Sequence, residues 1–310
     1  METSAYGCVL VALVLLGACR EPQPCDDGYV CHTIEVPADW HDPLGATYPL
    51  NVVVHEAKTD RIGPLFLNFG GPGTRASDYL PGFVDHVPGL VAHFDLVAVD
   101  PRGSDPDSPL NDRMDGPDGW LDTEIDTLDP GVYATQKAAI GAWLDGCWTA
   151  APELTAHMGT MDTVRDLEAV RLALGGEPMT YVGFSYGTEL GQMYADTYPH
   201  SLRAMVLAAV GRPGGTYLDF LDGQVDGFQS AFEDWAAWCA GEGASVCPMQ
   251  VDPTGGVASK GEVVAQALDN AQVLTWEGYG HTAMYVSDCV SEATFDDRVD
   301  GRLPSVATCP

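Results

Sequence analysis

Ser185 lies in a pentapeptide whose pattern is typical of a serine nucleophile. Gly183 and Gly187 stand two residues before and two residues after it, in the sequence Gly-Phe-Ser-Tyr-Gly. A short β-rich run precedes the pentapeptide and a helix-like stretch follows it, so the chain must turn sharply at the serine. Glycine at both flanking positions keeps Cβ atoms out of that crowded turn. The pattern predicts a serine that attacks acyl groups, although a glycine-rich turn of this kind can also serve packing alone.

A serine nucleophile needs a general base, and His281 is the candidate for that role. It lies in a glycine-rich loop directly after the strand-like run Val273–Trp276. The other histidines lie near the N-terminus, in the acidic middle of the chain or at the ends of expected helices. In a parallel sheet, loops that follow strands meet at one edge, where ligands bind. The serine and the histidine are therefore expected to meet at that edge.

The loop Gly70–Gly73 is a third candidate, because it directly follows the strand-like run Leu65–Phe69. Ser185 followed by His281 in chain order resembles an α/β-hydrolase, and this resemblance implies that the loop and the residue after the nucleophile supply the two backbone amides that stabilise a developing oxyanion. We assign these amides to Gly71 and Tyr186. Removal of one such donor costs about 3 kcal/mol of transition-state stabilisation.

The elements that must position these residues alternate between strands and helices. The first two strands, Tyr29–Val36 and Pro49–Glu56, read as a hairpin. The remaining strands are expected at Leu65–Phe69, Phe94–Asp100, Thr180–Val182, Leu202–Val210 and Val273–Trp276, and the helices at Val132–Cys147, Met161–Leu174, Thr188–Thr197, Leu218–Ala240 and Val257–Asn270. Strands that are apolar on both faces predict a mostly parallel sheet with helices on both sides. The aromatic residues at 220, 228, 232, 235 and 238 predict a helix that packs as a lid over the carboxyl-terminal edge of the sheet.

Composition limits the partners of the chain. Its 310 residues, 45% of them hydrophobic, suffice for one large α/β domain. The formal net charge of −31 argues against nucleic acid or an anionic membrane surface as a partner. A peptide or a small ester fits the predicted chemistry, and no cofactor is expected.

The N-terminus reads as an export signal. The apolar run Val9–Gly17 is too short to span a bilayer and suits a signal peptide over residues 1–18. Leu16-Gly-Ala-Cys19 resembles a bacterial lipobox, which makes Cys19 the predicted lipidation site and residues 19–28 a tether. Plain secretion is the alternative. The protein is thus expected to be exported, as a cell-envelope lipoprotein or a secreted protein, with membrane contact only through a lipid anchor.

The nine cysteines fit an exported protein. Short intervening loops suggest three disulfides, Cys25–Cys31, Cys239–Cys247 and Cys289–Cys309. This pairing leaves Cys147 without a partner in the mature chain. No cysteine or histidine cluster has the spacing of a zinc site, so no metal is expected.

Several motifs, taken in order, carry a family resemblance. They are Cys31-His-Thr-Ile-Glu-Val-Pro-Ala-Asp-Trp40, Asn68-Phe-Gly-Gly-Pro-Gly73, Val99-Asp-Pro-Arg-Gly-Ser104, Gly183-Phe-Ser-Tyr-Gly-Thr188 and Gly280-His-Thr282, and the C-terminal Ser287-Asp-Cys289, Gly301-Arg-Leu-Pro304 and Thr308-Cys309. Together they resemble the secreted tripeptidyl aminopeptidases, serine exopeptidases related to the proline iminopeptidases. The resemblance implies an α/β-hydrolase fold over residues 29–310, with a mostly parallel sheet and a short helical cap. It also implies Ser185 as nucleophile and His281 as general base.

The catalytic acid is where the sequence departs from this family. The family carries an aspartate after a further strand that lies between the cap and the histidine, and residues 212–256 read as a truncated cap insertion that leaves little room for such a strand. Asp252, followed by Pro253 and Thr254, stands at about the family spacing before His281. One interpretation makes Asp252 the acid. The other places it at the beginning of a shortened cap and leaves the acid missing or substituted.

Three functions follow from these interpretations. The first is a serine aminopeptidase that releases short peptides or single residues from free N-termini through an acyl-enzyme. The second is a carboxylesterase on the same scaffold, favoured if the shortened cap leaves the site open. The third is a catalytically impaired hydrolase that serves as a surface-bound binding lipoprotein, because loss of the acid can lower kcat on the order of 10⁴-fold.

Overall fold

The structure is a computed structural model of the full chain. It describes residues 23–25, 28–105, 107–110, 130–211, 217–242, 275–276, 289–290 and 308–309. The predicted signal peptide, Cys19, Asp252 and His281 lie outside these ranges, as does the expected helix Val257–Asn270.

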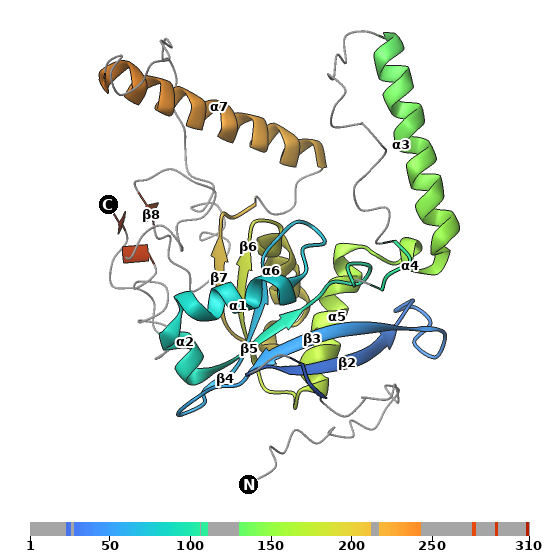
Figure 1. The fold of residues 1–310 in the computed structure, drawn as a ribbon, viewed down its shortest axis with the longest axis vertical. Helices are drawn as coiled ribbons and strands as arrows, with labels where there is room; N and C mark the ends of the chain where they lie inside the picture. Colours follow the sequence, from blue (N-terminus) through green and yellow to red (C-terminus); the bar gives the residue numbers. More distant parts are fainter. Residues whose placement is uncertain are drawn as a thin grey trace.

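A sheet with seven strands in the described residues forms the centre of the molecule (Figure 1). Its strands are β1 (Gln23–Pro24), β2 (Val30–Pro37), β3 (Thr47–His55), β4 (Gly63–Asn68), β5 (Phe94–Val99), β6 (Met179–Phe184) and β7 (Leu202–Ala208). They lie in the order β1-β2-β3-β5-β4-β6-β7. The strands β5, β4, β6 and β7 are parallel, whereas β1, β2 and β3 join by antiparallel pairing. The predicted hairpin and mostly parallel sheet are confirmed.

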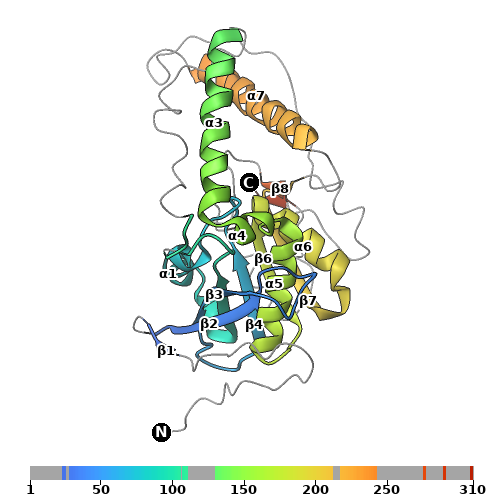
Figure 2. The ribbon, with the colours of Figure 1, turned by 90° about the vertical axis from the view of Figure 1, so that its right-hand side faces the viewer.

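Helices cover both faces of this sheet. The helices of the described residues are α1 (Ala76–His86), α2 (Pro88–His93), α3 (Pro130–Ala150), α4 (Pro152–Ala156), α5 (Thr160–Ala173), α6 (Tyr186–Thr197) and α7 (Tyr217–Glu242), with a 3₁₀ turn at Pro199–Ser201. The helices α1 and α2 lie on one face and α5 and α6 on the other (Figure 2). Two further short strands, β8 (Thr275–Trp276) and β9 (Thr308–Cys309), pair in parallel with each other.

Alternation along the central strands builds the two cores. Every residue of β4, β5 and β6 is buried. Leu65 and Leu67 pack with α1 and α2, whereas Phe66 between them packs on the opposite side with Tyr181. Burial of each such side chain contributes about 1.5–3 kcal/mol. The apolar runs read from the sequence therefore produce a rigid platform for the loops that follow β4 and β6.

The helix α7 differs from the expected lid. It stands beyond the carboxyl-terminal edge of the sheet, as Figure 2 shows. Its aromatic residues do not pack as predicted, since Phe228 is 75% exposed, Phe232 50% and Trp238 45%. The prediction that this stripe is buried is wrong for these three residues. Nothing in the local pattern distinguishes a buried aromatic stripe from an exposed one.

Two of the expected disulfides are present. Cys25 bonds to Cys31 and Cys289 bonds to Cys309, with Cα–Cα distances of 5.6 and 5.7 Å. The expected pair Cys239–Cys247 lies outside the described residues. Cys147 on α3 is a free, half-buried thiol, as predicted. In the described part of the chain, no helix has the length and apolar character needed to cross a membrane.

Candidate active site

Ser185 occupies a strained turn between β6 and α6. Its φ is 53° and its ψ is −121°, a backbone conformation that a residue with a Cβ atom rarely adopts. Such strain costs about 1–3 kcal/mol and persists where the surrounding structure enforces it. Here the Ser185 amide donates to the carbonyl of Ala208 on β7 at 3.0 Å. The Ser185 carbonyl accepts from the Thr188 amide at 2.9 Å and from the Thr188 hydroxyl at 2.6 Å.

The two flanking glycines permit this turn to pack closely. A Cβ atom at Gly187 would lie 2.6 Å from Oδ1 of Asn68 and 2.7 Å from its carbonyl oxygen. A Cβ atom at Gly183 would lie 2.7 Å from the ring of Tyr181, whose hydroxyl donates to the Gly187 carbonyl at 2.8 Å. The Gly-x-Ser-x-Gly spacing is thus a packing requirement of the turn itself.

The loop after β4 contacts the serine turn directly. A Cβ atom at Gly70 would lie 2.8 Å from the Phe184 carbonyl oxygen and 3.0 Å from the Ser185 Cβ. The amide of Gly70 already donates to Oδ1 of Asn68 at 3.0 Å. The next amide, that of Gly71, belongs to an exposed residue with a φ of +108°.

These two loops lie at the point where the strand order reverses. From β4 the chain proceeds to β5 on one side, whereas from β6 it proceeds to β7 on the other. In open parallel sheets this switch point is where ligands bind. The Tyr186 amide is in the first turn of α6, where helix amides have no intrahelical acceptor. The oxyanion roles of Gly71 and Tyr186 stay predictions.

The side chain of Tyr186 links the serine turn to α5. Its hydroxyl lies 2.8 Å from the hydroxyl of Thr160, the first residue of that helix. Burial raises the pKa of the Tyr186 phenol above its ordinary value, so it stays neutral near pH 7. Tyr186, the residue after the predicted nucleophile, thus has its backbone in α6 and its side-chain hydroxyl in contact with α5.

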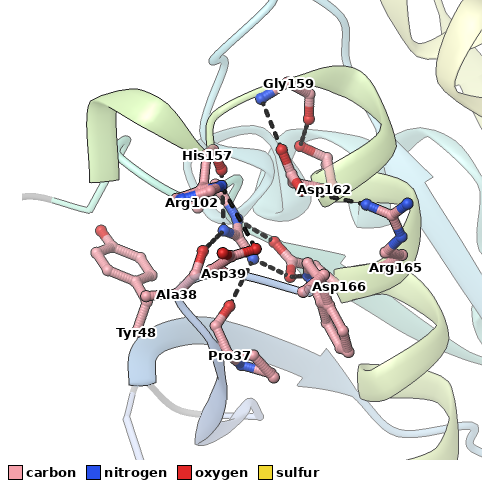
Figure 3. A network of polar contacts seen from close by, with 12 residues as sticks. Pro37, Ala38, Asp39, Tyr48, Arg102, His157, Gly159, Asp162, Arg165 and Asp166 are labelled. Carbon is pink, nitrogen blue, oxygen red and sulfur yellow. Dashed lines mark hydrogen bonds and ion pairs between the residues drawn. The ribbon is translucent and has the colours of Figure 1, made fainter. Parts of the chain in front are cut away.

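A buried ion pair fixes α5 in turn, and sequence reasoning did not identify it. Arg102, in the loop after β5, donates Nε to Oδ2 of Asp166 at 2.8 Å and Nη2 to Oδ1 at 2.5 Å (Figure 3). Both side chains are 1% exposed. Oδ1 of Asp166 also accepts from the Trp40 indole at 3.0 Å. Burial raises the pKa of the Asp166 carboxyl, and the Arg102 guanidinium opposes that shift.

The same guanidinium also binds three backbone carbonyls. Arg102 donates to Pro37, the last residue of β2, at 3.2 Å, to the next residue Ala38 at 2.8 Å, and to His157 at 2.9 Å (Figure 3). His157 lies three residues before Thr160. Arg102 therefore ties the loop after β5, the end of β2 and the approach to α5 into one unit.

Asp100 directly follows β5 and stands two residues before Arg102. It is buried and accepts from the Asn51 side chain at 2.8 Å, the Ser77 amide at 2.9 Å and the Ser77 hydroxyl at 2.7 Å. Its hydrogen bonds tie β3 and the beginning of α1 to the end of β5. A structural role thus accounts for this aspartate. Position after a buried strand, before Pro-Arg-Gly, is the sequence signal for it.

Of the predicted catalytic triad, only Ser185 lies among the described residues. Gly71 and Tyr186 also lie in the described part of the chain, whereas His281 and Asp252 do not. The base and acid assignments therefore stay predictions.

Comparison with known proteins addresses the family. A family profile described as alpha/beta hydrolase fold matches residues 63–244, which is more than half of the chain. A second profile, described as TAP-like protein, matches residues 248–309. The two matches follow one another along the chain and meet within the segment read as a truncated cap.

Three curated relatives are similar over most of this chain. Serine protease Hip1 of Mycobacterium tuberculosis is 33% identical over 261 residues, which are 81% of this chain and 49% of Hip1. Tripeptidyl aminopeptidase of Streptomyces lividans is 31% identical over 237 residues, 72% of this chain and 43% of that enzyme. Carboxylesterase B of M. tuberculosis is 35% identical over 227 residues, again 72% and 43%. This chain thus spans about half the length of these relatives or less, and it belongs to the α/β-hydrolase family.

Proposed function

We propose that this hydrolase is an exported serine aminopeptidase that releases short peptides or single residues from free peptide N-termini. The observation that carries the proposal is the conformation of Ser185. A strained serine on the turn between β6 and α6, at the switch point of the sheet, is the arrangement that exposes a nucleophilic hydroxyl in this fold.

In the proposed reaction, the Ser185 hydroxyl oxygen attacks the carbonyl carbon of the scissile amide while His281 takes its proton. The amides of Gly71 and Tyr186 donate to the oxyanion that forms. Collapse of this intermediate breaks the C–N bond, and His281 passes the proton to the departing amine. Water then attacks the acyl-enzyme ester, with His281 again as base, and restores the free serine.

Asp252 is the proposed acid that orients His281. The TAP-like match begins at residue 248 and includes both residues. An aspartate that accepts from the histidine ring holds the correct tautomer and stabilises the imidazolium. The peptidase preference is supported by the similarity to a tripeptidyl aminopeptidase and to a serine protease. The disulfides Cys25–Cys31 and Cys289–Cys309 support export.

The test uses chromogenic aminoacyl and tripeptidyl amides together with a fluorophosphonate probe. Wild-type protein is expected to release the amine and to be labelled, and Ser185→Ala to do neither. Ser201→Ala is the matched control, because its hydroxyl lies at the opposite end of α6 in the 3₁₀ turn. Labelling of wild type and Ser185→Ala to the same extent would rule out Ser185 as the nucleophile.

A carboxylesterase is the second candidate, and the 35% identity to a carboxylesterase favours it. It requires the same nucleophile and oxyanion donors but no binding of a free N-terminus. Turnover of p-nitrophenyl esters without cleavage of any peptide amide would decide for this function. Blocking the substrate N-terminus by acetylation separates the two candidates further, because only the aminopeptidase should lose activity.

A further inference from the structure

The helix α7 carries a row of exposed apolar side chains along one side. Leu218 is 70% exposed, Leu221 37%, Val225 65%, Phe228 75% and Phe232 50%. Their spacing of three and four residues places all five on one side of a helix. We call these five residues the α7 stripe. A row of this size that stays exposed on a single helix indicates an interaction surface.

Charge on the same helix restricts the partner. Six acidic residues and no lysine or arginine occur in Tyr217–Glu242; the acidic residues are Asp219, Asp222, Asp226, Glu233, Asp234 and Glu242. At about 100° per residue, Asp222, Asp226 and Glu233 follow one flank of the stripe. The full chain has a net charge of −31. A partner that covers the stripe must therefore be apolar on one side and cationic beside it.

The location of α7 relates this surface to the catalytic edge. Figures 1 and 2 both show α7 beyond the carboxyl-terminal edge of the sheet, the edge at which β6 ends and Ser185 follows. A molecule held on the stripe is thus on the side of the domain where the serine turn lies.

We propose that the α7 stripe docks cationic amphipathic peptides in helical form. This inference rests on the proposed peptidase function for its purpose, namely the selection of a substrate class, while the binding itself does not require catalysis. The apolar face of the peptide covers the stripe, and its lysine or arginine side chains meet the acidic flank. The N-terminus of the bound peptide is then delivered to the side of the domain that carries Ser185.

A second copy of the chain is the less suitable occupant. Contact between two α7 helices through the stripe would bring their acidic flanks, each with Asp222, Asp226 and Glu233, close together, with no cation on either helix to offset the repulsion. The helix α3 also exposes Tyr133, Leu144 and Trp148, but it carries one lysine and one aspartate and so has no net charge. It serves as the control surface.

The experiment measures binding to the full-length Ser185→Ala protein, which cannot consume the peptide by the proposed reaction. The probe is a fluorescein-labelled Leu/Lys amphipathic peptide about 18 residues long, or roughly five helical turns. Fluorescence anisotropy compares it with a Leu/Glu peptide of the same apolar pattern. We expect saturable binding of the cationic peptide, weakened by salt, and none of the anionic one.

Two pairs of substitutions locate the site. Val225→Ser with Phe228→Ser should weaken binding at least about tenfold, because two large apolar contacts are lost. The matched pair on α3, Tyr133→Ser with Trp148→Ser, should leave the affinity unchanged. Since all four side chains are exposed, neither pair removes core packing. Unchanged binding in the α7 pair, or an equal loss of binding in the α3 pair, overturns the inference.

Two further readouts separate the inference from the proposed function. Analytical ultracentrifugation tests the second copy as occupant, since a wild-type dimer that the α7 pair converts to monomer would overturn peptide docking. If the wild-type protein cleaves short peptide amides but the Val225→Ser, Phe228→Ser variant binds the cationic peptide with unchanged affinity, docking is refuted and the peptidase function stands. Stripe-dependent binding without any Ser185-dependent turnover keeps docking and refutes the peptidase.

Discussion

Replacing Gly187 by alanine tests the close packing on which the serine turn depends. The added Cβ would lie 2.6 Å from Oδ1 and 2.7 Å from the carbonyl oxygen of Asn68, well inside ordinary van der Waals contact. Asn68 ends the central strand β4, which pairs with both β5 and β6, so its carbonyl cannot retreat. Its side chain also accepts from the Gly70 amide in the loop that contacts Ser185. The clash must therefore displace the serine turn, the Gly70 loop or both.

The expected magnitude follows from this geometry. Overpacking of a well-packed site by one methyl group costs about 1–3 kcal/mol of stability. A displacement on the order of 1 Å between a nucleophile and its oxyanion donors costs about 10²-fold in rate. We therefore expect Gly187→Ala to unfold at lower urea concentration and to lose about a hundredfold in kcat on p-nitrophenyl esters, with KM changed much less.

Gly82→Ala is the matched control for this substitution. Gly82 lies inside α1, and a Cβ atom there meets nothing within 4 Å. Alanine is favoured over glycine in a helix interior by about 1 kcal/mol, so this variant should gain stability and keep its kcat. Should Gly187→Ala retain kcat within about twofold of wild type, the hundredfold loss expected from displacement of the turn is refuted.

Three further predictions concern the groups behind the turn. Arg102→Met leaves Asp166 buried without its ion-pair partner and should lower the free energy of unfolding by about 3–5 kcal/mol in urea titrations. A loss below about 1 kcal/mol would contradict a stabilising role for this ion pair. Tyr186→Phe and Thr160→Val should each lower kcat by about 2–10-fold, and the double variant by no more than either, because they remove one shared hydrogen bond; additive losses would refute the coupling. Burial opposes ionisation of Glu168, but bonds from Arg171 and Tyr194 outweigh it and lower its pKa. The Glu168 contribution is therefore full above its unfolded pKa, near 4.5, and is lost as the pH falls through the lower folded value, so the stability gap between wild type and Glu168→Gln should shrink in acid; a constant gap speaks against this linkage.

The elements that the sequence predicts well are those whose pattern is local. A nearly unbroken apolar run predicts the buried strand Phe94–Val99, and a pair of glycines predicts the turn at Ser185. Arg102 and Asp166, by contrast, are 64 residues apart, and no periodicity relates them. The exposure of Phe228 was missed for a related reason. A helical stripe shows which residues share a side but not what lies opposite.

The contacts around Ser185 and the proposed base and acid lie in different parts of the chain. Residues 37–211 contain the serine turn, the Gly70 loop, the Thr160–Tyr186 contact and the contacts of Arg102 with Asp166 and three backbone carbonyls. Among the described residues, the contacts that hold Ser185 in its conformation come from this segment. The proposed base and acid come from the TAP-like segment, residues 248–309. We therefore expect a change confined to residues 212–247 to alter substrate choice more than the conformation of Ser185.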